Sequence, residues 1–317
     1  MKAFRKKQKD EAQLAMAKRG RAERKKEKSS KWMKRQKIGS GVYLAPSLIG
    51  VLLFYILPFF VVIFYSVVDN PISRQFVGLE NFTKVAKNVA FQTAVKNTAT
   101  FSAIAVPLAV VLSLILAMVL DLRLPFRSQF RTFFLSPMMV PVASIVLIWQ
   151  VLFHYNGAVN DVLQAVGIGK IDWMKSQYAQ IVVIILFLWK NLGYNMILFM
   201  AALASIPREL IEVAELESAN RWQIFFHIKI RYLSSTILFV TIMSLINSFK
   251  VFREVYLLTG DHPYDSIYML QHFMNNAFAS LDYQRLSAAA ILMAAVMIVI
   301  IGILFLVENY FGKDVEG

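Results

Sequence analysis

The chain has 317 residues, of which 57 % are hydrophobic, 17 % are charged and none is cysteine. So large an apolar fraction excludes an ordinary soluble domain, and the lack of cysteine excludes disulfides, thiolate metal sites and cysteine nucleophiles. The formal net charge is +14, but residues 1–41 hold 16 of the 34 Lys and Arg and only 4 of the 20 Asp and Glu. The basic charge therefore belongs to one tail and does not indicate a nucleic-acid-binding surface.

Residues 1–41 form this polybasic tail, which precedes an apolar run that begins near Val42. The run is longer than the apolar core of a secretory signal and has no clear cleavage motif after it. We expect a cytoplasmic tail that holds positive charge beside the membrane, with binding of a specific partner as the alternative.

Six apolar runs follow, each close to the ~20 residues that a helix needs to cross a hydrocarbon core about 30 Å thick. Backbone groups find no water in that core, so each run must be a helix. The predicted fold is therefore all-α, a polytopic membrane protein with a transmembrane domain at 42–308 and a cytoplasmic C-terminal tail at 309–317. The six spans are expected at 42–68, 98–120, 133–153, 179–203, 234–258 and 287–307.

Prolines interrupt the first three spans and favour kinks, because proline lacks a backbone donor. Such kinks either line a pathway or merely reflect kinked packing. They lie at Pro46, Pro58, Pro107, Pro137 and Pro141.

The loops between the spans differ in basic charge. The two tails and the 121–132 and 204–233 loops carry 24 Lys and Arg, whereas the 69–97, 154–178 and 259–286 loops carry 7. The positive-inside rule then places both termini in the cytoplasm.

The loop at 207–233 is too long and too patterned to be a plain connector. Pro207 suits the first position of a helix, and Glu209 and Glu212 in the first turn complement the helix dipole. Ala214, Ser218 and Ala219 are small and spaced for one helix face, which would seat in a groove of another protein.

A second, apolar part of this loop is expected to pack on the span bundle. It contains Trp222, Phe225, Phe226 and Ile230. One face for the bundle and one for a partner suggest a lever that transmits force. The alternative is an interfacial helix that lies on the membrane.

Charged and polar side chains gather in the fourth and fifth spans. Charges inside a span are costly and are therefore functional candidates, and Lys190, Lys250 and Arg253 qualify. Lys250 and Glu254 are spaced i, i+4 and are expected to pair, while a structural ion pair or snorkelling is the alternative reading of these charges. The uncharged members of the group are Trp189, Asn191, Tyr194, Asn195, Ser244, Asn247 and Ser248.

The run from Glu212 to Ala219, followed by Ile228 and Ile230, resembles the Glu-Ala-Ala loop of ABC importer permeases. Four other segments, in the matching order, resemble the carbohydrate branch of that family. They are Gly78–Phe82, Gly157–Asn160, Ala202–Pro207 and Leu257–Pro263. The chain is identified by this resemblance as a type I ABC importer permease, similar to the maltose-type first permease subunit, over residues 42–308.

The resemblance implies that the loop is a coupling helix inserted into a cleft of a separate ATPase. Glu212 would pair with a basic group of that ATPase, and Ala214 and Ala219 would allow close approach. The ATPase-coupling residues are then Glu212, Ala214, Glu217, Ser218 and Ala219. Closure of the ATPase dimer would rock the spans between inward-open and outward-open states.

Relatives of the maltose type bind sugar from the fourth and fifth spans. The resemblance carries that role onto a substrate path, and the two cations suit an acidic or phosphorylated sugar. The path residues are Asn191, Tyr194, Ser244, Asn247, Ser248, Lys250 and Arg253. Hydrogen bonds between helices are the competing explanation for the uncharged members.

The implied partners are a second, related permease, two ATPase subunits, an extracytoplasmic solute-binding protein and membrane lipid, without nucleic acid. ATP and magnesium would be bound by the ATPase subunits, so no cofactor is expected in this chain, and the location is the bacterial cytoplasmic membrane.

The chain departs from the family pattern at three positions. Val213 replaces an alanine, Ser218 replaces a glycine and Arg231 replaces a proline. The serine is sterically mild unless the backbone there needs a positive φ.

Other function classes fit less well. An embedded enzyme would show a metal or nucleophile motif, but the four histidines lack ligand spacing, so we expect no enzyme. An ion-coupled transporter would need carboxylates inside the spans for proton or sodium coupling, and the sequence offers no convincing example of them. The chain also has no phosphate-binding loop, so its energy must come from another polypeptide. An importer of another solute, such as glycerol phosphate or an acidic oligosaccharide, stays as the alternative.

Overall fold

The computed structural model describes residues 43–122 and 125–312, so the basic tail lies outside the described residues. The chain divides into two units at Val62. The described part of the first unit is helical, and this helix, Tyr43–Ser66, continues past the unit boundary. It contains a π-helical stretch, η1 (Leu52–Ile56), and α2 (Leu57–Ser66).

The described regular elements are helices, and the only β pairing among them is one isolated antiparallel bridge between Val68 and Phe76. This confirms the all-α prediction. Five helices are long and apolar enough to cross a membrane, or six if one bent pair forms a span. They are Tyr43–Ser66, α4 (Val89–Asp121), α8 (Ala179–Ala204), the α12–α13 segment (Ser234–Thr259) and α15 (Tyr283–Gly312), of which Tyr283–Tyr310 is the spanning part.

The third predicted span is the bent pair. α5 (Arg127–Met139) and α6 (Val142–Leu152) meet at an angle of 98°. Pro137 lies inside α5 and Pro141 caps α6, and each lacks the donor that would continue the helix. The sequence predicts a span over 133–153 that these two prolines interrupt, and the bend lies at that interruption.

The fifth span is also interrupted. α12 (Ser234–Phe249) ends before Lys250, and α13 (Phe252–Thr259) begins two residues later. The remaining elements are short and connect the spans. They are α3 (Glu80–Lys87), α7 (Ala158–Ala165), η2 (Trp173–Lys175), α9 (Arg208–Leu216), α10 (Arg221–Ile224), η3 (Phe225–Lys229, a π-helix), α11 (Ile230–Tyr232), η4 (Asp265–Ile267) and α14 (Leu270–Ala279).

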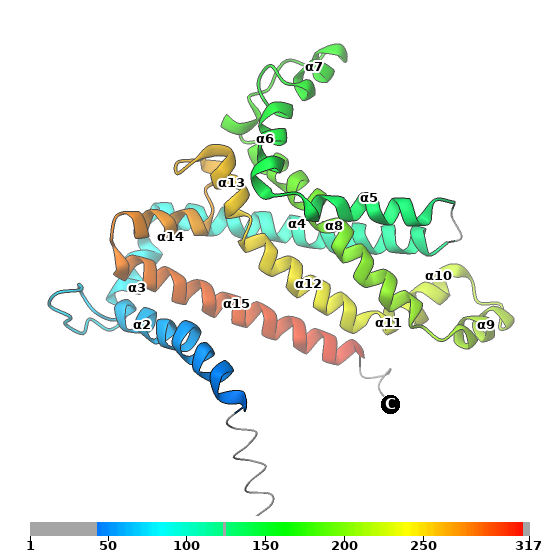
Figure 1. Ribbon diagram of the computed structural model, residues 1–317, viewed down its shortest axis with the longest axis horizontal. Coiled ribbons are helices and arrows are strands. Elements are labelled where there is room, and N and C mark those ends of the chain that lie inside the picture. The colour runs from blue at the N-terminus through cyan, green and yellow to red at the C-terminus, as the bar shows by residue number, and fades with distance from the viewer. Residues whose placement is uncertain (1–42, 123–124, 313–317) are drawn as a thin grey trace, which may run out of the picture. The chain divides into compact units, whose positions relative to one another are not determined.

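In the second unit, α8 packs on α4 and α5, and α12 packs on α4, α8 and α15 (Figure 1). Small residues allow these close contacts: Ala105, Ala109 and Ala117 of α4 are fully buried. At the α5–α8 crossing, a Cβ at Gly193 would lie 1.8 Å from the carbonyl oxygen of Phe134. No larger residue fits at this position without moving the backbone of α5.

Residues in three of the loop segments that resemble the family, Asn81, Asn160 and Gly260, hold the connections between helices in place. The Asn81 amide donates to the carbonyls of Ser66 and Val68, at 3.1 and 2.8 Å, and ties α3 to the end of the preceding helix. Asn160 is fully buried, and its amide group joins the loop before α7 to Ile171. Gly260 ends α13 with φ 79° and ψ −159°, a conformation essentially restricted to glycine.

Between the last two spans, α14 carries the buried His272. Its Nδ1 accepts from the backbone N–H of Met269 at 3.2 Å, and its Nε2 has no hydrogen-bond partner among the described residues. Burial lowers the pKa of His272 to about 4, although Asp261 opposes the shift. The ring packs edge-on against Phe252 of α13, so α13 and α14 meet at this neutral imidazole.

Candidate functional site

The 207–233 loop begins with α9, which Pro207 caps, and every residue of α9 is at least partly exposed. The helix ends in a Schellman motif: the Ala219 N–H donates to the carbonyl of Ala214 at 2.9 Å, and the Ser218 N–H donates to that of Glu215 at 3.0 Å. The motif requires a left-handed residue, and Ser218 supplies it with φ 62°. Serine therefore occupies a position that favours glycine, and the replacement is not sterically mild.

The second half of the loop starts directly afterwards. Asn220 forms a capping box with Gln223, in which each side chain accepts from the other residue's backbone N–H, at 2.7 and 2.8 Å. The chain then continues through α10, η3 and α11 into α12. Two cap motifs in succession fix the direction of the turn between α9 and α10.

The predicted small residues do not lie on one helix face, because α9 ends at Leu216, before Ser218 and Ala219. Instead the turn brings them to one side of a cleft of about 380 Å³, which we call the small-residue cleft. The cleft is lined by Ala214, Glu217, Ser218, Ala219, Gln223, Ile224, His227 and Ile228. Glu212 is exposed on α9 and is not part of this lining.

The apolar half of the loop behaves differently from the prediction. Phe225 and Ile230 pack against the buried cluster of α4, α8 and α12. Trp222 and Phe226 do not: their exposed fractions are 71 % and 57 %, and their rings stack on each other. The reason is the helical period, which turns these two residues away from the bundle while Phe225 faces it.

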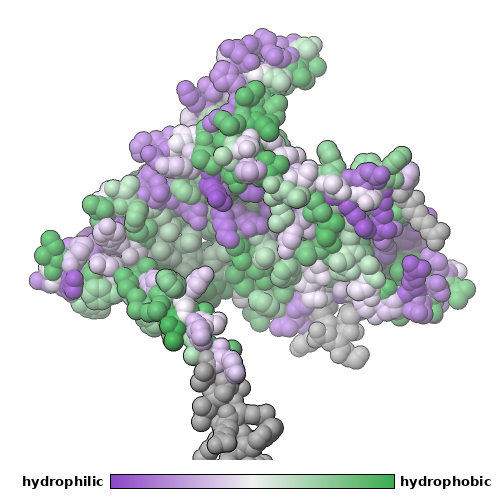
Figure 2. All heavy atoms as spheres, in the orientation of Figure 1, coloured by the Kyte–Doolittle hydropathy of each residue, from purple (hydrophilic) through white to green (hydrophobic). Residues whose placement is uncertain are grey.

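A second candidate site lies between α5, α8, α12 and α13. This polar cavity has a volume of about 380 Å³. Hydrophilic side chains gather on the surface where α13 meets α8 (Figure 2). The lining consists of Met138, Leu186, Phe187, Lys190, Asn191, Tyr194, Met243, Asn247, Lys250, Val251, Arg253 and Glu254.

The carboxylate in this cavity is Glu254, which is 5 % exposed. It forms an ion pair with Lys190 of α8. The expected pair between Lys250 and Glu254 was therefore wrong, because the break at Lys250–Val251 removes the regular helix on which the i, i+4 spacing depends. Lys250 and Arg253 are both exposed in this chain.

The uncharged candidates separate into two groups. Asn191 and Asn247 line the cavity with Tyr194, and the Asn247 amide donates to Oδ1 of Asn191 at 3.0 Å. Ser244 and Ser248 are buried outside it. Ser244 accepts from the Asn195 amide at 2.9 Å, and Ser248 pairs with Ser102 of α4 at 2.8 Å. The structure thus places these two serines in contacts between helices.

Sequence reasoning missed one wall of the polar cavity. Met138 comes from α5, far from the fourth and fifth spans in sequence. The sequence feature that could have indicated this wall is the pair of prolines on either side of Met138, Pro137 and Pro141, at which α5 ends beside the cavity. Sequence patterns also gave no sign that Gln223 and His227 line the small-residue cleft.

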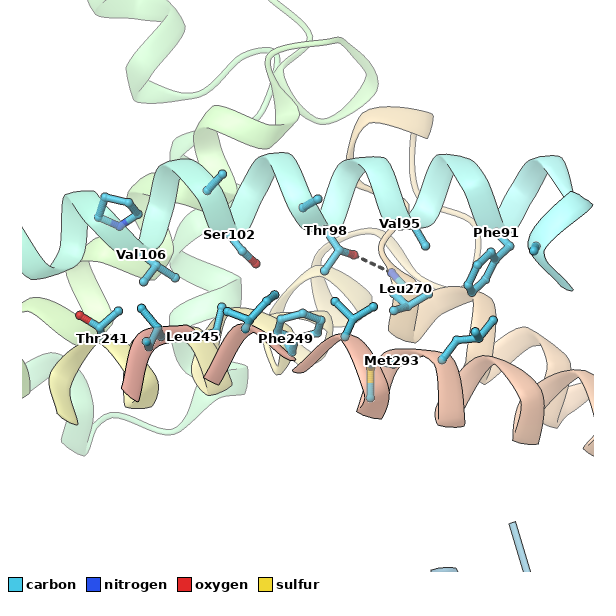
Figure 3. A pocket seen from close by; sticks show the side chains of 18 residues that line it. Phe91, Val95, Thr98, Ser102, Val106, Thr241, Leu245, Phe249, Leu270 and Met293 are labelled. Carbon is cyan, nitrogen blue, oxygen red and sulfur yellow. Dashed lines mark hydrogen bonds between the residues drawn. The ribbon is translucent and has the colours of Figure 1, made fainter. Parts of the chain in front are cut away.

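A third, larger hollow of about 540 Å³ is an apolar groove between α4, α12 and α15. Figure 3 shows aliphatic and aromatic side chains along both of its walls, with the Thr98 hydroxyl engaged by the backbone N–H of Leu270 at 2.9 Å. The groove offers few polar partners, so it does not suit a hydrophilic ligand.

Residues 109–317 match the family described as binding-protein-dependent transport system inner membrane component. The probable ABC transporter permease protein YurN of Bacillus subtilis is 30 % identical and covers 86 % of this chain and 95 % of its own length. The trehalose/maltose transport system permease protein MalF of Thermococcus litoralis is 28 % identical, over 86 % and 93 %. The sulfoquinovosyl glycerol transport system permease protein SmoG of Agrobacterium fabrum is 28 % identical, over 73 % and 77 %.

A chain of similar fold has been solved in the crystal structure of a bacterial alginate ABC transporter in complex with an alginate pentasaccharide-bound periplasmic protein. The TM-score is 0.77 at 20 % identity, over 88 % of this chain and 96 % of that chain.

Proposed function

This chain belongs to the family of binding-protein-dependent transport system inner membrane components, and from that premise we propose that it is a permease subunit of an ATP-driven importer for a sugar or oligosaccharide. Relatives named for trehalose/maltose, lactose and arabinooligosaccharides support a carbohydrate substrate. The chain itself is a multi-pass membrane protein rather than an enzyme.

The observation that carries the proposal is the construction of the 207–233 loop. Its two cap motifs hold α9 and α10 at a fixed turn, while Phe225 and Ile230 anchor the loop to the spans. The α9 side chains stay exposed, including Glu212. A loop that is rigid, anchored on one side and open on the other suits the transfer of motion from a partner to the spans.

In this proposal a separate ATPase docks on α9 and the small-residue cleft. Glu212 pairs with a basic group of the ATPase, and the small side chains of Ala214, Ser218 and Ala219 permit close approach. Glu217 lies in the cleft lining and contributes a second carboxylate. The sequence holds no phosphate-binding loop, so ATP and magnesium belong to the partner.

The polar cavity is proposed as part of the substrate path. Asn191, Asn247 and Tyr194 present amide and hydroxyl groups beside the apolar wall of Phe187, and this mixture suits the hydroxyl edges and apolar faces of a sugar ring. Lys250 and Arg253 are exposed in the single chain, which fits a path completed by a second permease.

The family supports the remaining parts of the proposed assembly. An extracytoplasmic binding protein delivers the substrate, and two ATPase subunits and a second, related permease complete the complex. We place the protein in the bacterial cytoplasmic membrane with the 207–233 loop and both termini in the cytoplasm, as the distribution of Lys and Arg indicates.

The test is copurification of the assembled complex from membranes, followed by substrate-stimulated ATP hydrolysis. For Glu212→Ala we expect the stimulated rate to fall at least about tenfold, because a charge-assisted hydrogen bond is lost. Glu209→Ala is the matched control, since Glu209 is also an exposed carboxylate of α9, one turn earlier. If substrate stimulates ATP hydrolysis normally in Glu212→Ala, or if the wild type recruits no ATPase, the proposal that the 207–233 loop transmits motion to the spans is contradicted.

A further inference from the structure

The polar cavity contains an excess of positive charge. Three cationic side chains line it, Lys190, Lys250 and Arg253, against the single carboxylate of Glu254. The cavity lies deep in the span region: Lys190 occupies the middle of α8, about 17 Å from the helix start at a rise of 1.5 Å per residue. Charge at such a depth is costly unless a partner balances it.

Glu254 balances only one of these cations. Its carboxylate is nearly fully buried and is bound by the Lys190 ammonium group. The side chain of Lys190 is 29 % exposed, so this pair forms the inner wall of the cavity. The pair is electrically neutral and fully formed within this chain.

Lys250 and Arg253 have no such counter-charge. In the described part of the chain neither side chain forms an ion pair or a hydrogen bond, and both are exposed toward the cavity that they line. Both stand at the helix break, Lys250 just after α12 and Arg253 in the first turn of α13. The positive end of α13 adds to the charge of Arg253, whereas the end of α12, which Lys250 caps, carries partial negative charge.

The uncharged lining completes the pattern. The Asn191 amide donates to the carbonyl of Phe187 at 2.8 Å and its Oδ1 accepts from Asn247, so Asn191 positions Asn247. Asn247 and Tyr194 are then the neutral groups for sugar hydroxyls beside the two cations. An Arg guanidinium and a Lys ammonium together are the usual partners of a carboxylate, sulfonate or phosphate group.

From this arrangement we infer that the importer, if it acts on carbohydrate as proposed above, takes an acidic saccharide, whose anionic group is bound by Lys250 and Arg253. These two residues determine specificity. The ion pair with Glu254 keeps Lys190 from acting as a third anion-binding group, and the ammonium group of Lys190 neutralises the Glu254 carboxylate, which would otherwise repel an anionic substrate.

The experiment uses the complete transporter, with its ATPase and second permease, in lipid nanodiscs. Binding is measured calorimetrically for three matched probe pairs: digalacturonate against galactobiose, glucuronate against glucose, and sulfoquinovose against quinovose. We expect at least one acidic probe to bind about tenfold more tightly than its neutral partner, because a charge-assisted pair is worth at least one such factor. The preference should weaken as salt rises.

The double variant Lys250→Met/Arg253→Met should lose this preference, whereas Lys250→Arg/Arg253→Lys should keep most of it. Lys84→Met is the control, because Lys84 pairs with Glu80 on the distant α3. Absence of preference for any acidic probe, including absence of binding, overturns the inference. So does loss of the second permease from the Met/Met variant, because the cations would then pair with that subunit.

The two proposals fail separately. Stimulation of ATP hydrolysis by a neutral sugar would overturn the acidic substrate and leave the importer standing. If the wild-type protein recruits no ATPase, the proposed function as an importer is contradicted, whatever affinities the probes show.

Discussion

At the residue scale, Lys190 and Glu254 show how a membrane span tolerates charge. Lys190 lies at the middle of α8, where an unpaired ammonium group is expensive, and Glu254 of α13 is the acid that pairs with it. The two residues are 64 positions apart. Their contact therefore also fastens the broken fifth span to the fourth.

Removal of one partner should cost more than removal of both. In Lys190→Met the carboxylate of Glu254 stays buried without a counter-charge, and we expect a loss of about 3 kcal/mol in the free energy of unfolding. In Lys190→Met/Glu254→Gln the loss should be smaller, because no buried charge remains. Thermal unfolding of the purified complex compares the two. A double variant that is less stable than the single variant would contradict this role of the pair.

At the element scale, the 207–233 loop depends on one strained residue. Ser218 is held at φ 62° by the Schellman motif that ends α9, and non-glycine residues lose about 1–2 kcal/mol in that conformation. The capping box of Asn220 follows directly and fixes the next helix. The loop therefore keeps its turn even though the residue at the turn is not the favoured glycine.

Ser218→Gly should relieve this strain and protect the end of α9. We expect the backbone amides at positions 218 and 219 to exchange with solvent about fivefold more slowly than in the wild type, which corresponds to about 1 kcal/mol of local stability. Hydrogen exchange measured by mass spectrometry on the loop peptides checks this. Ser218→Ala is the matched control and should leave exchange nearly unchanged, because alanine is equally strained. Faster exchange in Ser218→Gly would mean that the serine hydroxyl stabilises the turn.

At the scale of the whole molecule, the second unit combines a bundle with a neutral histidine at the junction of α13 and α14. His272 is buried against Phe252, and its pKa of about 4 lies well below the ordinary value of 6.5. At pH values between about 4 and 6.5, this histidine therefore binds a proton in the unfolded chain more readily than in the folded chain. Stability that depends on this junction must fall as the pH falls from about 6.5 toward 4.

We expect the free energy of unfolding to decrease by about 3 kcal/mol over that interval, since each unit of pKa difference is worth about 1.4 kcal/mol. Melting temperatures of the wild type between pH 7 and pH 4, compared with those of His272→Phe, isolate this contribution. The variant should show a flatter pH dependence. Equal pH dependence in the two proteins would assign the effect to other groups.

Sequence alone determined the class of the fold and most of the span positions. Apolar runs of sufficient length can only be helices inside a membrane, so the all-α prediction and five of the six spans needed no tertiary information. The prolines at 137 and 141 also indicated a disturbance of the third span. Sequence did not give its 98° angle, because the angle depends on how α5 and α6 pack on separate neighbours, α8 and α13.

The sites needed the tertiary structure, because they depend on contacts between distant residues. A spacing of i, i+4 suggested Lys250 as the partner of Glu254. The helix breaks between these two residues and α8 packs nearby, so Lys190 of α8 pairs with Glu254 instead. The same contacts between helices removed Ser244 and Ser248 from the polar cavity and added Met138. Local patterns specify helices, since their hydrogen bonds are local. Which side chain faces a cavity is decided by the packing of whole helices, and packing is not local in sequence.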